Sequence, residues 1–176
     1  MPVRRISRRE LAQTTVTGLL VGWAGCIDQA QDLLIGGHER KIFNRYKETY
    51  RIATRSVDLA ADGLDDVQAG DWTAAKPKFQ ESRGLAQRSI DRFRETYDMA
   101  RFIANTKVQR SVTESWTKCL SVRDFTTEAM TAVNYMENGS PDSATQWFEN
   151  EALPNWEAAQ DHELVPPAEI KRELGL

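Results

Sequence analysis

Apolar residues recur at intervals of three and four along most of the chain after residue 40, which places them on one stripe of a helix. Such stripes cover residues 42–67, 75–104, 108–136 and 144–159. No segment shows the strict alternation of apolar and polar residues that is typical of a half-buried strand. The pattern therefore predicts an all-α protein.

Local signals predict where the first helices begin and end. Gly70 ends the first helix, and Asp71 caps the second by accepting a backbone N–H bond. Pro77 removes one hydrogen bond near the start of that helix, so we expect an irregularity or kink there. One helix through the second and third stripes would be about 100 Å long. We therefore expect a turn near Asn105-Thr106.

The second half of the chain carries clearer signals. Asn138-Gly139 ends the third helix, and Ser140-Pro141 opens a fourth, with serine as the cap and proline at the first helical position. Pro154 lies inside the fourth stripe and is expected to split or kink that helix.

Four amphipathic helices with short connections predict an antiparallel four-helix bundle. We assign the bundle to residues 41–162 and a C-terminal tail, with room for one further short helix, to residues 163–176. Residues 26–40 are predicted to be a tether with a break at Gly36-Gly37. The alternative is that residues 27–35 form a short helix packed on the domain.

Two stretches of the predicted bundle resemble each other. Residues 44–53 (NRYKETYRIA) and 91–100 (DRFRETYDMA) are identical at five of ten positions. The offset of 47 residues lies in the range of helical repeats, so one interpretation is a duplicated helical hairpin. The other is chance similarity between amphipathic helices.

The first 25 residues have the layout of a secretory signal. Basic residues 2–9 are followed by a weakly apolar stretch, residues 11–25, that ends in small residues. The stretch is about 15 residues long, whereas a membrane-spanning helix needs about 20. The alternative is an ordinary N-terminal helix, which this charge pattern does not suit.

Two short motifs add to this layout. Arg8 and Arg9, in Ser7-Arg8-Arg9-Glu10-Leu11, resemble the twin-arginine export motif, and Trp23-Ala24-Gly25-Cys26 resembles a lipobox. Trp23 stands where the lipobox usually has leucine. The combination resembles the signal peptides of lipoproteins from halophilic archaea. This resemblance implies cleavage after residue 25, a lipid on Cys26 and anchoring to the outer face of the cytoplasmic membrane, at the cell surface.

Charge limits the classes of binding partner, and cysteine content limits the disulfide bonds that can form. Without residues 1–25, which hold four of the 23 basic and one of the 26 acidic residues, the net charge is near −6. An acidic surface disfavours nucleic acid and anionic lipid. If Cys26 is lipidated, Cys119 has no disulfide partner. A Cys26–Cys119 disulfide would require the lipobox interpretation to be wrong.

Candidate chemical sites are few. His38 and His162 each lack the Glu three residues before it that a di-iron bundle uses, and haem and zinc spacings are absent, so we expect neither metal nor cofactor. Cys119 lies on an apolar stripe and is predicted to be a buried, inert thiol. The acidic residues at 58, 62, 65 and 66 are predicted to form a solvated face. Asn138 begins an Asn-Gly-Ser sequon on a predicted loop and is a candidate glycosylation site.

An aromatic cluster is the strongest candidate for a binding surface. Trp147, Phe148 and Trp156 lie close together around Pro154, where they either fill the end of the core or form a ligand or partner surface. Because no nucleophile–base pair or paired carboxylates stand out, we predict a non-enzymatic, lipid-anchored module that binds another envelope protein. The alternative is a ligand-binding or sensory bundle, which would need a pocket.

Overall fold

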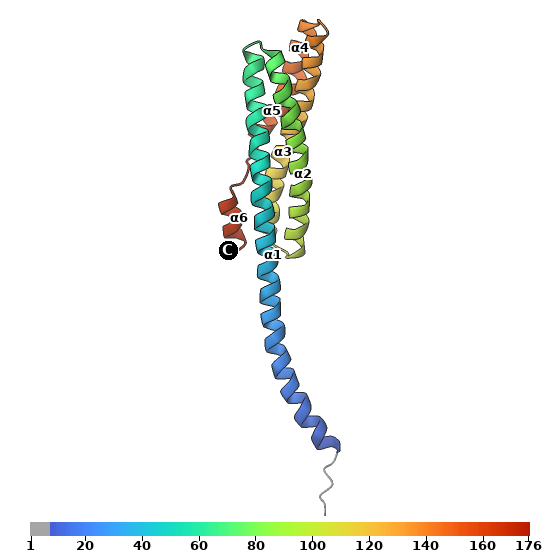
Figure 1. Cartoon of the computed structure of the whole chain (residues 1–176), viewed down its shortest axis with the longest axis vertical. Coiled ribbons are helices and arrows are strands. Elements are labelled where there is room, and N and C mark those ends of the chain that lie inside the picture. Colours follow the sequence, from blue (N-terminus) through green and yellow to red (C-terminus); the bar gives the residue numbers. More distant parts are fainter. Residues whose placement is uncertain (1–7) are drawn as a thin grey trace, which may run out of the picture. The chain divides into compact units, whose positions relative to one another are not determined.

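The computed structural model describes the backbone of residues 8–176 and the side chains of residues 37–176 (Figure 1). The described helices are, in chain order, α1 (Arg8–Gln68), α2 (Trp72–Phe102), α3 (Thr106–Glu137), α4 (Pro141–Trp147), the π-helical segment η1 (Phe148–Ala152), α5 (Leu153–Gln160) and α6 (Pro167–Glu173). The chain divides into two compact units, residues 1–38 and 39–176, of which the second carries the core. None of the helices with described side chains is long and apolar enough to span a membrane.

The all-α class is confirmed, and α1, α2 and α3 are long antiparallel helices that pack together. The fourth helix of the predicted bundle is not one regular helix but the succession α4, η1 and α5, which packs along α3. The interruption falls next to Pro154, as predicted. Proline has no N–H to donate, and the N–H of Leu153 bonds to the carbonyl of Phe148, five residues earlier, as in a π-helix.

The helix boundaries follow the predicted signals closely. Gly70 has a φ of +82°, and the carboxylate of Asp71 accepts the backbone N–H of Ala74 at 2.9 Å. Asn105 caps α3 by accepting the N–H of Val108 at 3.1 Å. Gly139 ends the third helix with a φ of +76°. These signals decide where the described chain turns.

Two of three further local predictions need correction. Gly37 lies within α1, so it does not end the helix on its N-terminal side; a helical glycine costs only about 1 kcal/mol. Residues 26–36 of the predicted tether lie outside the described side chains. Helix α2 continues past Pro77, and a kink at this residue stays a prediction. Ser140 stands at the N-cap of α4, but its side chain makes no cap bond.

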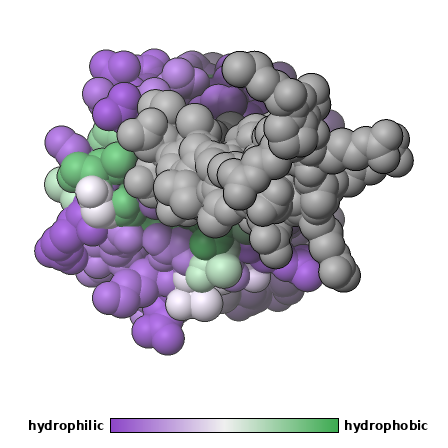
Figure 2. Space-filling view, turned by 90° about the horizontal axis from the view of Figure 1, so that it is seen from below, coloured by the Kyte–Doolittle hydropathy of each residue, from purple (hydrophilic) through white to green (hydrophobic). Residues whose placement is uncertain are grey.

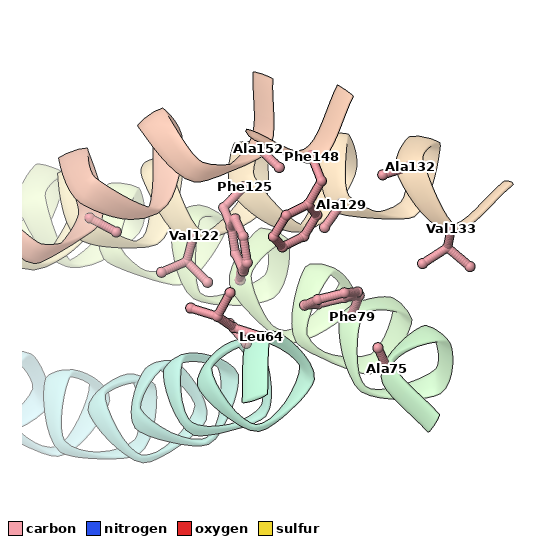
Figure 3. Close-up of a cluster of buried hydrophobic side chains, with 13 residues drawn as sticks. Leu64, Ala75, Phe79, Val122, Phe125, Ala129, Ala132, Val133, Phe148 and Ala152 are labelled. Carbon is pink, nitrogen blue, oxygen red and sulfur yellow. The ribbon is translucent and has the colours of Figure 1, made fainter. Parts of the chain in front are cut away.

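The core consists of two clusters of buried side chains. The first contains Leu64 of α1, Phe79 of α2, Phe125 of α3 and Phe148 of η1, whose side chains converge in Figure 3. The second is built around Tyr46 and Phe93, whose rings lie 5.4 Å apart. Many of the remaining core positions are alanine, which lets the helices approach closely.

The C-terminal segment belongs to the core and is not a tail outside the domain. Val165, Ile170 and Leu174 are buried in the second cluster. A closed ring of buried hydrogen bonds holds Val165: the Tyr46 hydroxyl donates to its carbonyl at 2.7 Å, and its N–H donates to Ser115 Oγ at 3.0 Å. Ser115 Oγ lies 2.8 Å from the Tyr46 hydroxyl, which completes the ring. The boundary predicted at residue 162 therefore divides one packed unit.

Candidate functional site

The three aromatic residues singled out in the sequence do not share one surface. Phe148 is only 5% exposed and makes an edge-on contact with Trp72, with ring centroids 5.6 Å apart. Trp156 is half-buried and packs against Phe125, with ring centroids 5.0 Å apart. Both side chains therefore belong to the first core cluster, where burying aromatic rings stabilises the fold.

Trp147 is placed differently, since it lies on the side of α4 that faces the C-terminal half of α3. Its indole N–H donates to Glu128 Oε2 at 3.0 Å, and its ring lies 5.7 Å from that of Tyr135. Trp147 is half-buried and packs against the first core cluster, as Trp156 does, but its indole also reaches the polar surface beside α3.

Trp147 lines the wall of a hollow that opens to solvent. The hollow has a volume of about 350 Å³ and is lined by Tyr135, Ser143, Gln146, Trp147, Asn150 and Glu151. It combines two aromatic side chains with hydroxyl, amide and carboxylate groups. Tyr135 escaped the sequence analysis, although an aromatic residue between the stripe positions Val133 and Met136 signals an aromatic side chain turned away from the core.

A second hollow lies on the other side of η1. It has a volume of about 290 Å³ and brings together Val67 of α1, Trp72 of α2 and Leu153 of α5. Because these residues come from three helices, no sequence window groups them. The π-helical segment is therefore flanked by two open hollows.

This half of the bundle is strongly acidic. Residues 58–80 and 123–160, here called the η1 half, carry 12 acidic and three basic side chains. All three basic residues are in ion pairs: Lys76 with Glu137 at 2.6 Å, Lys78 with Asp66 at 2.6 Å and Arg123 with Asp124 at 2.7 Å. The hydrogen bond to Asp66 is the largest of the causes that raise the pKa of Lys78. The hollows thus lie in a field of negative charge.

The other candidate residues behave as structural groups. Cys119 is free and 1% exposed, and burial raises the pKa of its thiol to about 12, so the thiolate needed for nucleophilic chemistry is disfavoured. His162 Nδ1 lies 3.0 Å from Glu114 Oε1. Among the residues with described side chains, no group of three or more His, Cys, Asp or Glu is placed to hold a metal ion.

The remaining predicted site residues are exposed or lie outside the described side chains. Asn138 is exposed at the end of α3, where a sequon would be accessible. The acidic residues at 58, 62 and 65 are exposed, as expected for a solvated face, whereas Asp66 is half-buried and pairs with Lys78. Arg8, Arg9 and Cys26 lie outside the described side chains.

No protein-family model matches this sequence, and no curated protein or solved structure is significantly similar to it. Arguments about function therefore rest on the residues themselves.

Proposed function

We propose that the chain is an exported lipoprotein whose helical bundle is a non-enzymatic interaction module. In this proposal Arg8 and Arg9 direct export, and a lipid on Cys26 holds the protein on the outer face of the cytoplasmic membrane. The module has the four-helix-bundle type of architecture, with α4, η1 and α5 as its fourth helix. The lipobox-like sequence supports the anchor, and the geometry of the η1 half supports the interaction.

The observation that carries the interaction is the pair of hollows beside η1, set in an acidic half of the bundle. Half-buried tryptophan at the edge of a hollow is typical of the anchor residues of protein interfaces. The surrounding carboxylates favour a cationic partner and disfavour nucleic acid. The partner we propose is another envelope protein that presents a basic segment with one or more apolar side chains.

The anchor is tested by the intact mass and membrane partitioning of the wild type and of Cys26→Ser. We expect the wild type to lack residues 1–25, to carry a lipid-sized mass increment and to fractionate with membranes, because a thioether can form only on cysteine. The serine variant should lack the increment. Two full-length, unmodified, water-soluble proteins would contradict the anchor.

The interaction is tested by co-purification from detergent-solubilised membranes, with quantification of the captured proteins. Trp147→Ala should reduce capture of a specific partner about tenfold or more, because interface tryptophans commonly contribute 2 kcal/mol or more. Trp116→Ala is the matched control, since Trp116 is also half-buried and packs against the second core cluster as Trp147 packs against the first. A preparation that yields only the bait, or equal loss in both variants, would argue against this interface.

A ligand-binding or sensory bundle is the second candidate, and the hollow lined by Tyr135 and Trp147 favours it. Its volume of about 350 Å³ is near the lower end of small-molecule sites. A ligand there would change tryptophan fluorescence in the purified protein without any partner, and Trp147→Phe would remove most of that change.

A further inference from the structure

One end of the bundle has a composition unlike the rest. Residues 37–44, 98–110 and 168–176, here called the α6 end, lie together in space. Asn105 Nδ2 donates to the carbonyl of Glu173 at 3.1 Å, which joins the turn before α3 to α6. Lys41 of α1 and Met99 of α2 line the same surface hollow. The three segments thus form one surface.

The α6 end is basic, although the chain as a whole is acidic. It carries seven basic and four acidic side chains, whereas the η1 half carries three basic and 12 acidic ones. All seven basic side chains are exposed: Arg40, Lys41, Arg101, Lys107, Arg110, Lys171 and Arg172. One of the four acids, Glu173, is turned inward, where it accepts a hydrogen bond from Ser111 at 3.1 Å. The charges of the two ends are therefore opposite in sign.

Exposed apolar side chains gather at the same end. Among the described side chains, the exposed large hydrophobic residues are Phe102, at 77%, and Leu176, at 37%, and both belong to the α6 end. Figure 2 views the unit from this end and shows apolar patches among hydrophilic side chains. An exposed aromatic side chain on a surface that also carries lysine and arginine is typical of a surface that meets a membrane interface.

The short chain separation between Cys26 and residue 38 also favours a membrane contact at the α6 end. It lies 12 residues after Cys26, a length that spans at most about 40 Å even when fully extended. The η1 half begins at residue 58, which is 32 residues after Cys26 and therefore farther along the chain from the proposed lipid. Along the chain, residues 37–44 of the α6 end are therefore the part of the bundle that follows the proposed anchor most closely.

We propose that the α6 end docks on an anionic lipid surface, with Phe102 entering the interfacial layer and the basic side chains meeting lipid phosphates. This inference rests on the proposed anchor at Cys26. It also refines the expectation that net charge disfavours anionic lipid, because a net charge averages two ends of opposite sign. The acidic η1 half would be turned toward the envelope space, where its hollows are accessible.

The test is vesicle binding by residues 26–176 carrying Cys26→Ser, so that no lipid is attached. This chain keeps both core clusters, which lie within residues 42–174. We expect binding to phosphatidylglycerol vesicles in about 0.1 M salt, and its loss in about 1 M salt, where the Debye length falls to about 3 Å. Phosphatidylcholine vesicles should bind about tenfold more weakly or worse.

Three variants then test the surface itself. Arg101→Gln with Lys171→Gln should weaken binding about tenfold or more, since each basic residue near an anionic surface contributes about fivefold. Phe102→Ser should weaken it several-fold. Arg83→Gln with Arg88→Gln removes the same charge from exposed positions of α2 outside the α6 end and should have little effect.

Circular dichroism confirms that each variant is folded before its binding is compared. Equal binding to the two kinds of vesicle, or equal weakening by the Arg83 and Arg88 pair, would overturn the proposal. Because the tested chain carries no lipid, this result is independent of the mass measurement on Cys26. A failed anchor and a failed docking surface are thus distinguished.

Discussion

At the scale of single residues, Gly63 shows how closely α1 and α2 pack, and Ala104 shows how sharply the chain turns after α2. A Cβ atom added to Gly63 of α1 would lie 2.6 Å from Cε1 of Phe79, which is closer than atoms can approach. Ala104, in the turn between α2 and α3, has a φ of +53°, a left-handed conformation that costs about 1–2 kcal/mol for an L-residue.

We expect Gly63→Ala to destabilise the protein by about 1–3 kcal/mol, because the methyl group forces the Phe79 ring to move. Alanine's higher helix propensity, worth about 1 kcal/mol, offsets only part of this cost. Gly84→Ala is the matched control. Gly84 lies in α2 with no atom within 4 Å of an added Cβ, so this change should stabilise by about 0.5–1 kcal/mol. Urea unfolding of both variants measures the difference, and equal effects would contradict the close contact.

At the scale of the elements, local signals set the helix ends, and side-chain contacts set the pairing. The stretches 44–53 and 91–100, which resemble each other in sequence, face each other across the antiparallel α1–α2 pair. Arg45 forms an ion pair with Glu95, and Arg92 forms one with Glu48 at 3.7 Å. Residues at matching positions of the two stretches thus form equivalent ion pairs across the helix pair. Duplication of a helical hairpin remains a prediction.

The caps of α2 and α4 allow a direct comparison of two N-terminal signals. Asp71→Ala removes the bond to the N–H of Ala74 and should cost about 1 kcal/mol. Ser140→Ala removes a side chain that makes no cap bond and should change the stability by less than about 0.5 kcal/mol. Thermal unfolding gives both values. If the two changes cost the same, the geometry found at Asp71 does not contribute to stability.

At the scale of the whole molecule, buried groups of the second core cluster make stability depend on alkaline pH. Burial raises the pKa of Cys119 from 9.0 to about 12, and burial likewise raises the pKa of Tyr46 above its usual 10.0. Each group is neutral when protonated, and its folded pKa is higher than its unfolded one. Its contribution to stability is therefore complete below the unfolded pKa and is lost as the pH rises toward the folded pKa.

We accordingly expect the denaturation midpoint to fall progressively between pH 9 and pH 12. Burial lowers the pKa of Lys118, so the effect of this residue on stability changes with pH in the opposite direction. The Lys118 side chain is partly exposed, and its ammonium group donates hydrogen bonds to the carbonyls of Ala159 and His162. Cys119→Ala removes the thiol titration, so its midpoint should fall less steeply with pH even though its absolute stability is lower. An unchanged midpoint from pH 8 to pH 11 would contradict this account.

The sequence by itself determined the all-α class, the stripes and most helix ends, because helical periodicity and capping are local properties of the chain. It also placed Cys119 in the core and an interruption near Pro154. It predicted a tail where the structure has the buried residues Val165, Ile170 and Leu174, since Tyr46 and Ser115, which hold Val165, lie 50 or more positions away.

Only the tertiary structure decided which aromatics stay at the surface. Phe148 and Trp147 are neighbours in the chain, yet one enters the core and the other borders a hollow, because adjacent helical side chains point about 100° apart and packing against the other helices decides which of them faces inward. The tertiary structure also decided the separation of the basic α6 end from the acidic η1 half. Residues 37–44, 98–110 and 168–176 form one basic surface only after the helices pack side by side, and no local sequence pattern contains that information.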